Sequence, residues 1–132
     1  MTINETNRLL ITDALSDLLL LIQESVPHLS HTSADNINEN TLAIASAKIK
    51  LEKIKENQHQ PFSLQELKVI YWAVRNLRDE TRDYLDSLAC SDSDRDDAMS
   101  AYRTENAVLR ELRAEFAQAG IEIEQLFQDP ES

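Results

Sequence analysis

Three carboxylates in the second half of the sequence could take part in chemistry. Glu80 and Asp83 stand three residues apart, so a helix would place both side chains on one face, and Glu105 falls inside the apolar stripe of a later helix. Carboxylates brought together in this way could hold Mg²⁺ in an all-helical hydrolase. Such a site needs a second acidic pair that faces the first, and the neighbouring helices offer none in register. Because Arg78 and Arg82 stand beside these carboxylates, a solvated, ion-paired helix face is the favoured interpretation.

Glu105 is the most unusual of these residues because it interrupts an apolar stripe, between Tyr102 and Leu109. A carboxylate in such a place must be paired, be protonated, or lie near the end of the bundle. Arg78 stands at the edge of the apolar stripe of the preceding helix. Glu105 and Arg78 are therefore predicted to form a buried polar pair that fixes the register of the helices. A polar binding site inside the bundle is the alternative.

The acidic run at 92–97 begins like a calcium-binding loop but departs from that pattern at its two most demanding positions. Asp97 stands where the sharp turn needs glycine, and Arg103 stands where a bidentate glutamate is needed. We expect these residues to cap a helix instead. His28 and His31 are close enough in sequence to share a metal, but no cysteine or third histidine stands near them, and His59 and Cys90 are each isolated. No metal, no cofactor and no catalytic residue is therefore predicted.

The composition narrows the function classes further. The chain has 132 residues, the length of one domain, and a formal charge of −11 that disfavours nucleic acid and anionic membranes as partners. A single glycine excludes glycine-rich phosphate loops. No small-molecule substrate is predicted. The longest apolar run, 18–22, is far too short to span a bilayer. One cysteine and an N-terminus without a basic region favour a cytoplasmic location.

Four helices must position these residues. Hydrophobic periodicity and cap signals predict helices at 3–25, 37–57, 64–88 and 92–119, with a polar break at 28–36. Ser63 and Glu66 form a capping-box pattern before the third helix, and Gly120 is placed to end the fourth. The predicted fold is all-α: an antiparallel four-helix bundle with a short C-terminal helical extension. It forms a single domain over 1–127, followed by a frayed tail at 128–132.

The predicted helix at 37–57 carries two apolar faces. Leu42, Ala45 and Ile49 lie on one of them at helical spacing. The opposite face carries a larger apolar set: Ile37, Ile44, Ala47, Leu51 and Ile54. Such a helix either lies centrally in the bundle or contributes to an oligomer interface. A homo-oligomer, in the simplest case a dimer, is the favoured interpretation, and a compact monomer is the alternative.

Trp72 is the strongest candidate for a contact with a partner. It is the only tryptophan, and its position points away from the core stripe of its helix, with Val69 beside it. A loop that folds over Trp72 is the alternative. The predicted partner-binding residues are Trp72, Val69, Ile44 and Leu51.

These observations predict a non-enzymatic, acidic helical protein that binds another protein or itself. Two other functions stay open. The first is an acidic decoy or inhibitor of a nucleic-acid-binding protein, encoded by a mobile element, since residues 91–132 hold four basic against eleven acidic side chains. The second is a magnesium-dependent hydrolase that uses Glu80, Asp83 and Glu105.

Overall fold

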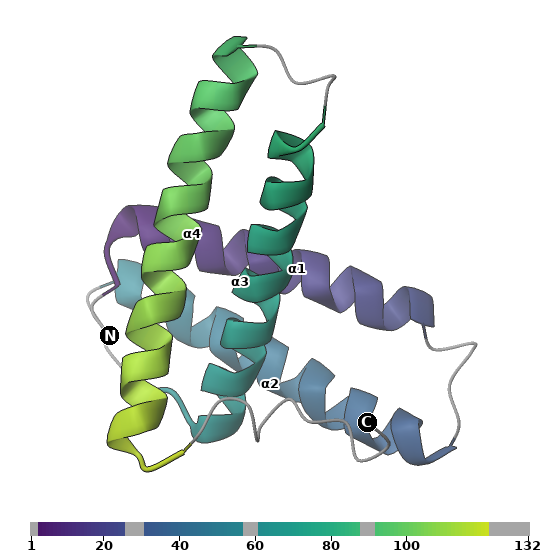
Figure 1. The fold of residues 1–132 in the computed structure, drawn as a ribbon. Helices are drawn as coiled ribbons and strands as arrows, with labels where there is room; N and C mark the ends of the chain where they lie inside the picture. The colour runs from purple at the N-terminus through teal and green to yellow at the C-terminus, as the bar shows by residue number, and fades with distance from the viewer. Residues whose placement is uncertain (1–2, 26–30, 57–60, 88–91, 122–132) are drawn as a thin grey trace.

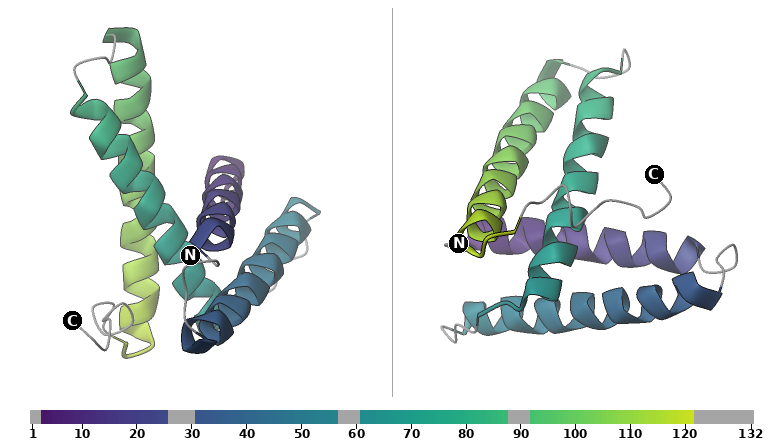
Figure 2. Two further views of the ribbon diagram at one scale, coloured as in Figure 1. Left: turned by 90° about the vertical axis from the view of Figure 1, so that its right-hand side faces the viewer. Right: turned by 60° about the horizontal axis from the view of Figure 1, so that its bottom comes forward.

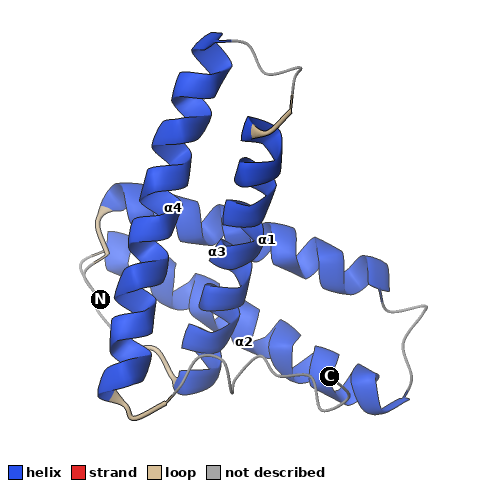
Figure 3. Cartoon of the chain, in the orientation of Figure 1, coloured by secondary structure: helices blue, strands red, loops and turns tan. Residues whose placement is uncertain are grey.

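The described part of the chain consists of four α-helices and their turns, with no strand (Figure 3). The computed structural model describes residues 3–25, 31–56, 61–87 and 92–121, except the side chains of 25 and 31–38. The helices are α1 (Glu5–Ser25), α2 (His31–Lys55), α3 (Leu64–Leu85) and α4 (Asp92–Gln118). The predicted all-α bundle is confirmed. The predicted C-terminal extension and the tail after 121 lie outside the described residues, as do His28, His59 and Cys90.

The four helices form two antiparallel pairs that cross each other. Figure 1 shows α1 beside α2 and α3 beside α4, and the second pair lies across the first. In the views of Figure 2, α2 lies on the opposite side of the molecule from α4. α3 packs against all three other helices, whereas α4 packs mainly on α3. α3 is therefore the central helix of the described fold, and the possibility that the helix at 37–57 lies centrally is wrong.

The core lies where the two pairs cross, and all four helices contribute to it. Tyr71 and Phe116 are its largest side chains, with their rings edge-to-face at a centroid distance of 6.3 Å. This arrangement suits the ring quadrupoles. The buried aliphatic residues around them are Ile11, Ala14, Leu15, Leu18, Ile22, Ala43, Ile44, Ala47, Leu51, Val69, Ile70, Ala73, Val74, Val108, Leu109 and Leu112.

The predicted helix caps at the start of α3 and the end of α4 are both formed. The Glu66 amide donates to Ser63 Oγ, and the Ser63 amide donates to Glu66 Oε1 at 2.7 Å. At the end of α4, Gly120 has φ +75°, which an L side chain rarely adopts. The Ile121 amide bonds to the Phe116 carbonyl and the Gly120 amide to the Ala117 carbonyl, completing a Schellman motif. These caps fix where α3 begins and α4 ends.

α2 begins six residues earlier than the sequence predicts, at His31 rather than Ile37. The Ser, Thr, Asp and Asn residues at 31–36 favour turns, and for that reason the sequence predicts a break there. None of the positions between 31 and 36 is Gly or Pro, however, and the other residue types lower helix stability by less than about 0.7 kcal/mol each. The backbone therefore continues the helix through a segment that looks like a loop.

Candidate interaction surface on the second helix

α2 carries an exposed apolar face, formed by Leu42, Ala45 and Ile49 and called here the outer face. Leu42 is 70% exposed and Ile49 58% exposed, and Ala45 is also exposed. The opposite side of the same helix is buried, with Ile44, Ala47 and Leu51 at 0% exposure. The two predicted apolar faces are confirmed at these positions, while the side chain of Ile37 lies outside the described residues and Ile54 is partly buried. Only one of the two faces is used by the described part of the fold.

Polar contacts on the α1 side of α2 fix its rotation. Lys48 Nζ donates to Ser16 Oγ at 2.9 Å. Arg8, whose side chain is almost fully buried, lies 3.5 Å from Glu52 and also pairs with Glu5 on its own helix. These contacts join the edge of α2 to α1. The outer face is therefore held away from the core rather than free to roll into it.

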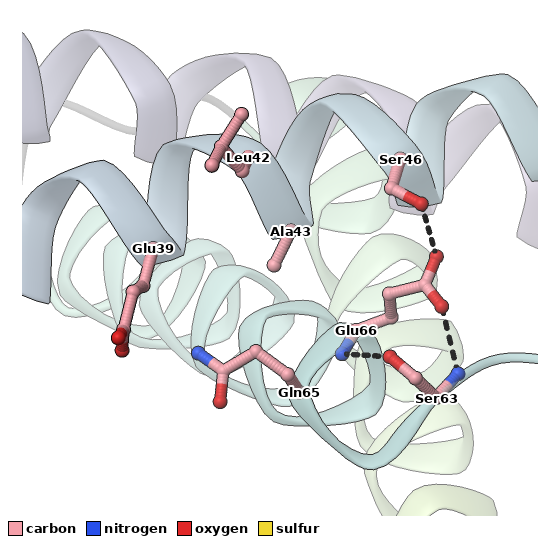
Figure 4. A pocket seen from close by; sticks show the side chains of 7 residues that line it. All are labelled: Glu39, Leu42, Ala43, Ser46, Ser63, Gln65 and Glu66. Carbon is pink, nitrogen blue, oxygen red and sulfur yellow. Dashed lines mark hydrogen bonds between the residues drawn. The ribbon is translucent and has the colours of Figure 1, made fainter.

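The other side of α2 borders a groove of about 390 Å³ at the start of α3. Figure 4 shows Leu42 and Glu39 on the α2 wall and Gln65 on the α3 wall. The full lining is Glu39, Leu42, Ala43, Ser46, Ser63, Gln65 and Glu66. The groove is thus continuous with the outer face through Leu42, and it combines apolar surface with carboxylates.

Glu66 forms the base of this groove and is held by donors from α2 besides its own cap. Lys50 Nζ lies 2.5 Å from Oε1 and also donates to the Pro61 carbonyl, while Ser46 Oγ donates to Oε2 at 2.9 Å. Burial raises the pKa of Glu66, but the hydrogen bonds from Lys50, Ser63 and Ser46 outweigh it and hold the pKa below its ordinary value of 4.5. Since both oxygens are engaged within the chain, Glu66 ties α2 to α3.

The structure places three of the four predicted contact residues in the core. Val69, Ile44 and Leu51 have 0% exposure and contact other helices of the same chain. α3 buries a wider arc than one stripe because it touches three helices, and this arc includes Val69. Trp72 is half-buried and packs against the core cluster. A partner contact at these four positions stays a prediction. Among the described residues, Leu42 and Ile49 of α2 are the most exposed large apolar side chains, and α1 also exposes Leu9, Leu20 and Leu21.

Glu105 is buried, as predicted, but it does not pair with Arg78. Its side chain is 3% exposed; Thr81 Oγ1 donates to Oε2 at 3.1 Å, and Oε1 has no hydrogen-bond partner among the described residues. Arg78 instead contacts Asp79 at 2.8 Å and donates to Asn106. Burial raises the pKa of Glu105, and nearby Glu80 adds to the rise, while Thr81 and the charge of Arg78 oppose it. The carboxyl group is therefore poorly solvated when ionised.

Replacing Glu105 by Gln, which mimics the protonated carboxyl, is expected to stabilise the fold at about pH 7 by about 1 kcal/mol. A raised folded-state pKa means that the favourable contribution of this group is complete below its unfolded value of 4.5 and is lost as the pH rises through the folded value. The advantage of Glu105→Gln should therefore vanish at about pH 4. Urea unfolding at both pH values measures it. Glu111→Gln, at an exposed position of α4, is the control. An equal gain in stability from Glu105→Gln at both pH values would contradict a raised pKa at Glu105.

The other candidate sites do not assemble in the described ranges. The acidic run from Asp92 to Asp97 lies within α4 and is exposed, so it forms no calcium loop. No group of three or more His, Cys, Asp or Glu side chains in the described part of the chain is arranged to hold a metal, and Glu80 and Asp83 are exposed. None of the described helices is long and apolar enough to cross a bilayer.

A second groove, of about 470 Å³, lies between the far ends of α3 and α4, and the sequence pattern gives no sign of it. Its lining is Arg82, Leu85, Asp86, Arg95, Met99 and Tyr102. Arg95 closes one side by donating to the Leu85 carbonyl at 3.0 Å. Residues this far apart in sequence show no common pattern until the two helices are paired. The groove mixes charges of both signs and points to no particular ligand.

Comparison of the chain with protein-family models, with curated proteins and with solved structures gave no significant match in any of the three. The fold and the surface by themselves define the class, which is an all-α helical bundle with an exposed apolar helix face.

Proposed function

We propose that this chain is a non-enzymatic protein-interaction module that self-associates through the outer face of α2. The observation that carries the proposal is the contrast between the two sides of one helix. Leu42 and Ile49 are more than half exposed, while Ile44 and Leu51 on the other side are fully buried. Exposed apolar side chains grouped on one rigid helix are typical of contact surfaces rather than of freely solvated faces.

The firm attachment of α2 supports this proposal. Lys48 and Glu52 bind it to α1, and Lys50 binds it to α3 through Glu66. A helix held at both edges presents its outer face without a rearrangement, and pre-organisation of this kind lowers the entropy loss on binding. A cytoplasmic location and the absence of a cofactor belong to the same proposal. The acidic decoy and the magnesium-dependent hydrolase are the alternative functions.

Solution mass tests the proposed function directly. We expect the wild-type chain to approach twice 15.1 kDa as its concentration rises, measured by light scattering and by sedimentation equilibrium. One helix face is a small interface, so the dissociation constant should be on the order of micromolar. Ile49→Asp should weaken the association by at least about tenfold, because a charge would be buried in the contact.

Leu20→Asp is the matched control for this experiment. Leu20 is 56% exposed on α1, so the substitution introduces the same charge at an equally open leucine away from the outer face of α2. It should leave the dissociation constant unchanged. A wild-type mass that stays at 15.1 kDa at every concentration would overturn self-association, and equal weakening by both variants would remove the outer face as its site.

A further inference from the structure

The charge distribution indicates which surface two copies of this acidic chain can share. Each copy carries −11, so two copies repel each other across most of their surfaces. α2 differs, because its sequence holds four lysines against three carboxylates, whereas α3 holds four basic and four acidic side chains and α1 and α4 each hold an excess of carboxylates. Two copies therefore approach with the least repulsion along α2, where the outer face lies.

The outer face is also nearly symmetric along its length. Leu42 lies three residues before Ala45, and Ile49 lies three residues after Ser46. A second α2 running in the opposite direction would therefore place Leu42 of one copy against Ile49 of the other, twice. The small residues Ala45 and Ser46 would lie at the centre, where they allow the two helices to approach closely. All four residues are exposed in the single chain.

The charges beside the outer face nearly follow the same symmetry. Glu39 and Lys53 each stand seven residues from Ser46, so their centre lies half a residue from that of Leu42 and Ile49. Their helical positions place both on the flank of the outer face toward the groove, which Glu39 lines. In an antiparallel helix pair, flanks of the same side meet, as they do in antiparallel coiled coils. Glu39 of one copy therefore meets Lys53 of the other, and the pair occurs twice. A parallel pair would instead place the same flank of the two copies on opposite sides of the contact, so Glu39 and Lys53 would not meet.

We infer that the occupant of the outer face is α2 of a second copy, packed antiparallel about a two-fold axis near Ala45 and Ser46, with Glu39 paired to Lys53 of the other copy at both ends. This inference rests on the proposed self-association and adds its geometry. The Lys53 side chain of the second copy enters the groove beside Glu39 and Leu42. The pairing is isologous, so it closes at two copies and does not propagate.

Charge reversal tests this geometry, with the dissociation constant from sedimentation equilibrium as the measurement. Glu39→Lys and Lys53→Glu should each weaken the dimer by about tenfold, because each places like charges at both ends of the contact. The double variant E39K/K53E should recover to within about threefold of wild type, because it restores both pairs in reversed order. The single variants change the net charge in opposite directions, so a general effect of net charge would move them oppositely.

Cysteine cross-linking in a Cys90→Ser background provides the second readout. Glu39→Cys mixed with Lys53→Cys should give a disulfide-linked pair, and each variant alone should give little. Cross-linking of each variant with itself, and not with the other variant, would overturn the inference. So would a dimer that depends on Ile49 but ignores both charge reversals, although the proposed function would then stand. A wild-type chain that stays monomeric would overturn both.

Discussion

Replacing Leu51 by Ala is expected to lower the free energy of unfolding by about 2–5 kcal/mol, while the same change at Leu42 should alter it by less than about 0.5 kcal/mol. Both leucines belong to α2, but Leu51 is fully buried and Leu42 is 70% exposed. Loss of Leu51 removes buried methyl groups and leaves a cavity between α2 and its neighbours. Loss of Leu42 removes surface that is already in water.

Urea unfolding at low protein concentration measures this difference without a contribution from association. The solution mass should show the reverse order: Leu42→Ala should weaken self-association, whereas Leu51→Ala should leave it intact as long as the chain stays folded. The two substitutions are chemically identical, so helix propensity does not distinguish them. Equal losses of stability at both positions would show that the outer face is packed within the chain.

The periodicity of the sequence is enough to predict the two faces of α2. Positions about 100° apart define which side chains share a face whatever the helix packs against. The caps are equally local, because Ser63 with Glu66 and Gly120 act within one turn of their helices. These features need no knowledge of the tertiary structure.

Which helix lies centrally does not follow from periodicity, because it depends on how the two helix pairs cross. α3 buries Val69 and Ala73 in addition to the stripe expected for a one-sided helix. Its buried arc is wide because three neighbours surround it. The sequence pattern therefore assigns Val69 to a partner-binding surface, although its immediate neighbours are other helices of the same chain.

The environment of Glu105 is predictable only in part for a related reason. Its burial follows from its place in an apolar stripe, which is a local property. Its partner depends on which side chains lie close enough to contact it. Arg78 Nε lies 2.8 Å from Oδ1 of the adjacent Asp79. The hydroxyl of Thr81 supplies a hydrogen bond instead. Sequence patterns locate a buried charge more readily than they identify its partner.

Replacing Glu66 by Ala is expected to lower the free energy of unfolding by about 3 kcal/mol, since it breaks a buried ion pair and a helix cap together. The change removes the carboxylate that accepts hydrogen bonds from Lys50 Nζ, Ser46 Oγ and the Ser63 amide. Lys50 keeps its bond to the Pro61 carbonyl and is 20% exposed, which limits the loss. Thermal and urea unfolding measure it, and a change below about 0.5 kcal/mol would contradict the role assigned to Glu66.

Glu66→Gln separates the charge of this residue from its hydrogen bonds, because the amide retains an acceptor for the Ser63 amide. Hydrogen bonds keep the folded-state pKa of Glu66 below 4.5, so the stabilisation by its charge is complete above the unfolded pKa and is lost as the pH falls through the folded value. The free energy of unfolding of wild type should therefore exceed that of Glu66→Gln by about 1–2 kcal/mol at about pH 7. The two free energies should converge on acidification below about pH 4. Glu105→Gln changes stability with the opposite sign at neutral pH, so the two buried glutamates serve as mutual controls. A gap between wild type and Glu66→Gln that persists in acid would show that shape, and not charge, joins α2 to α3.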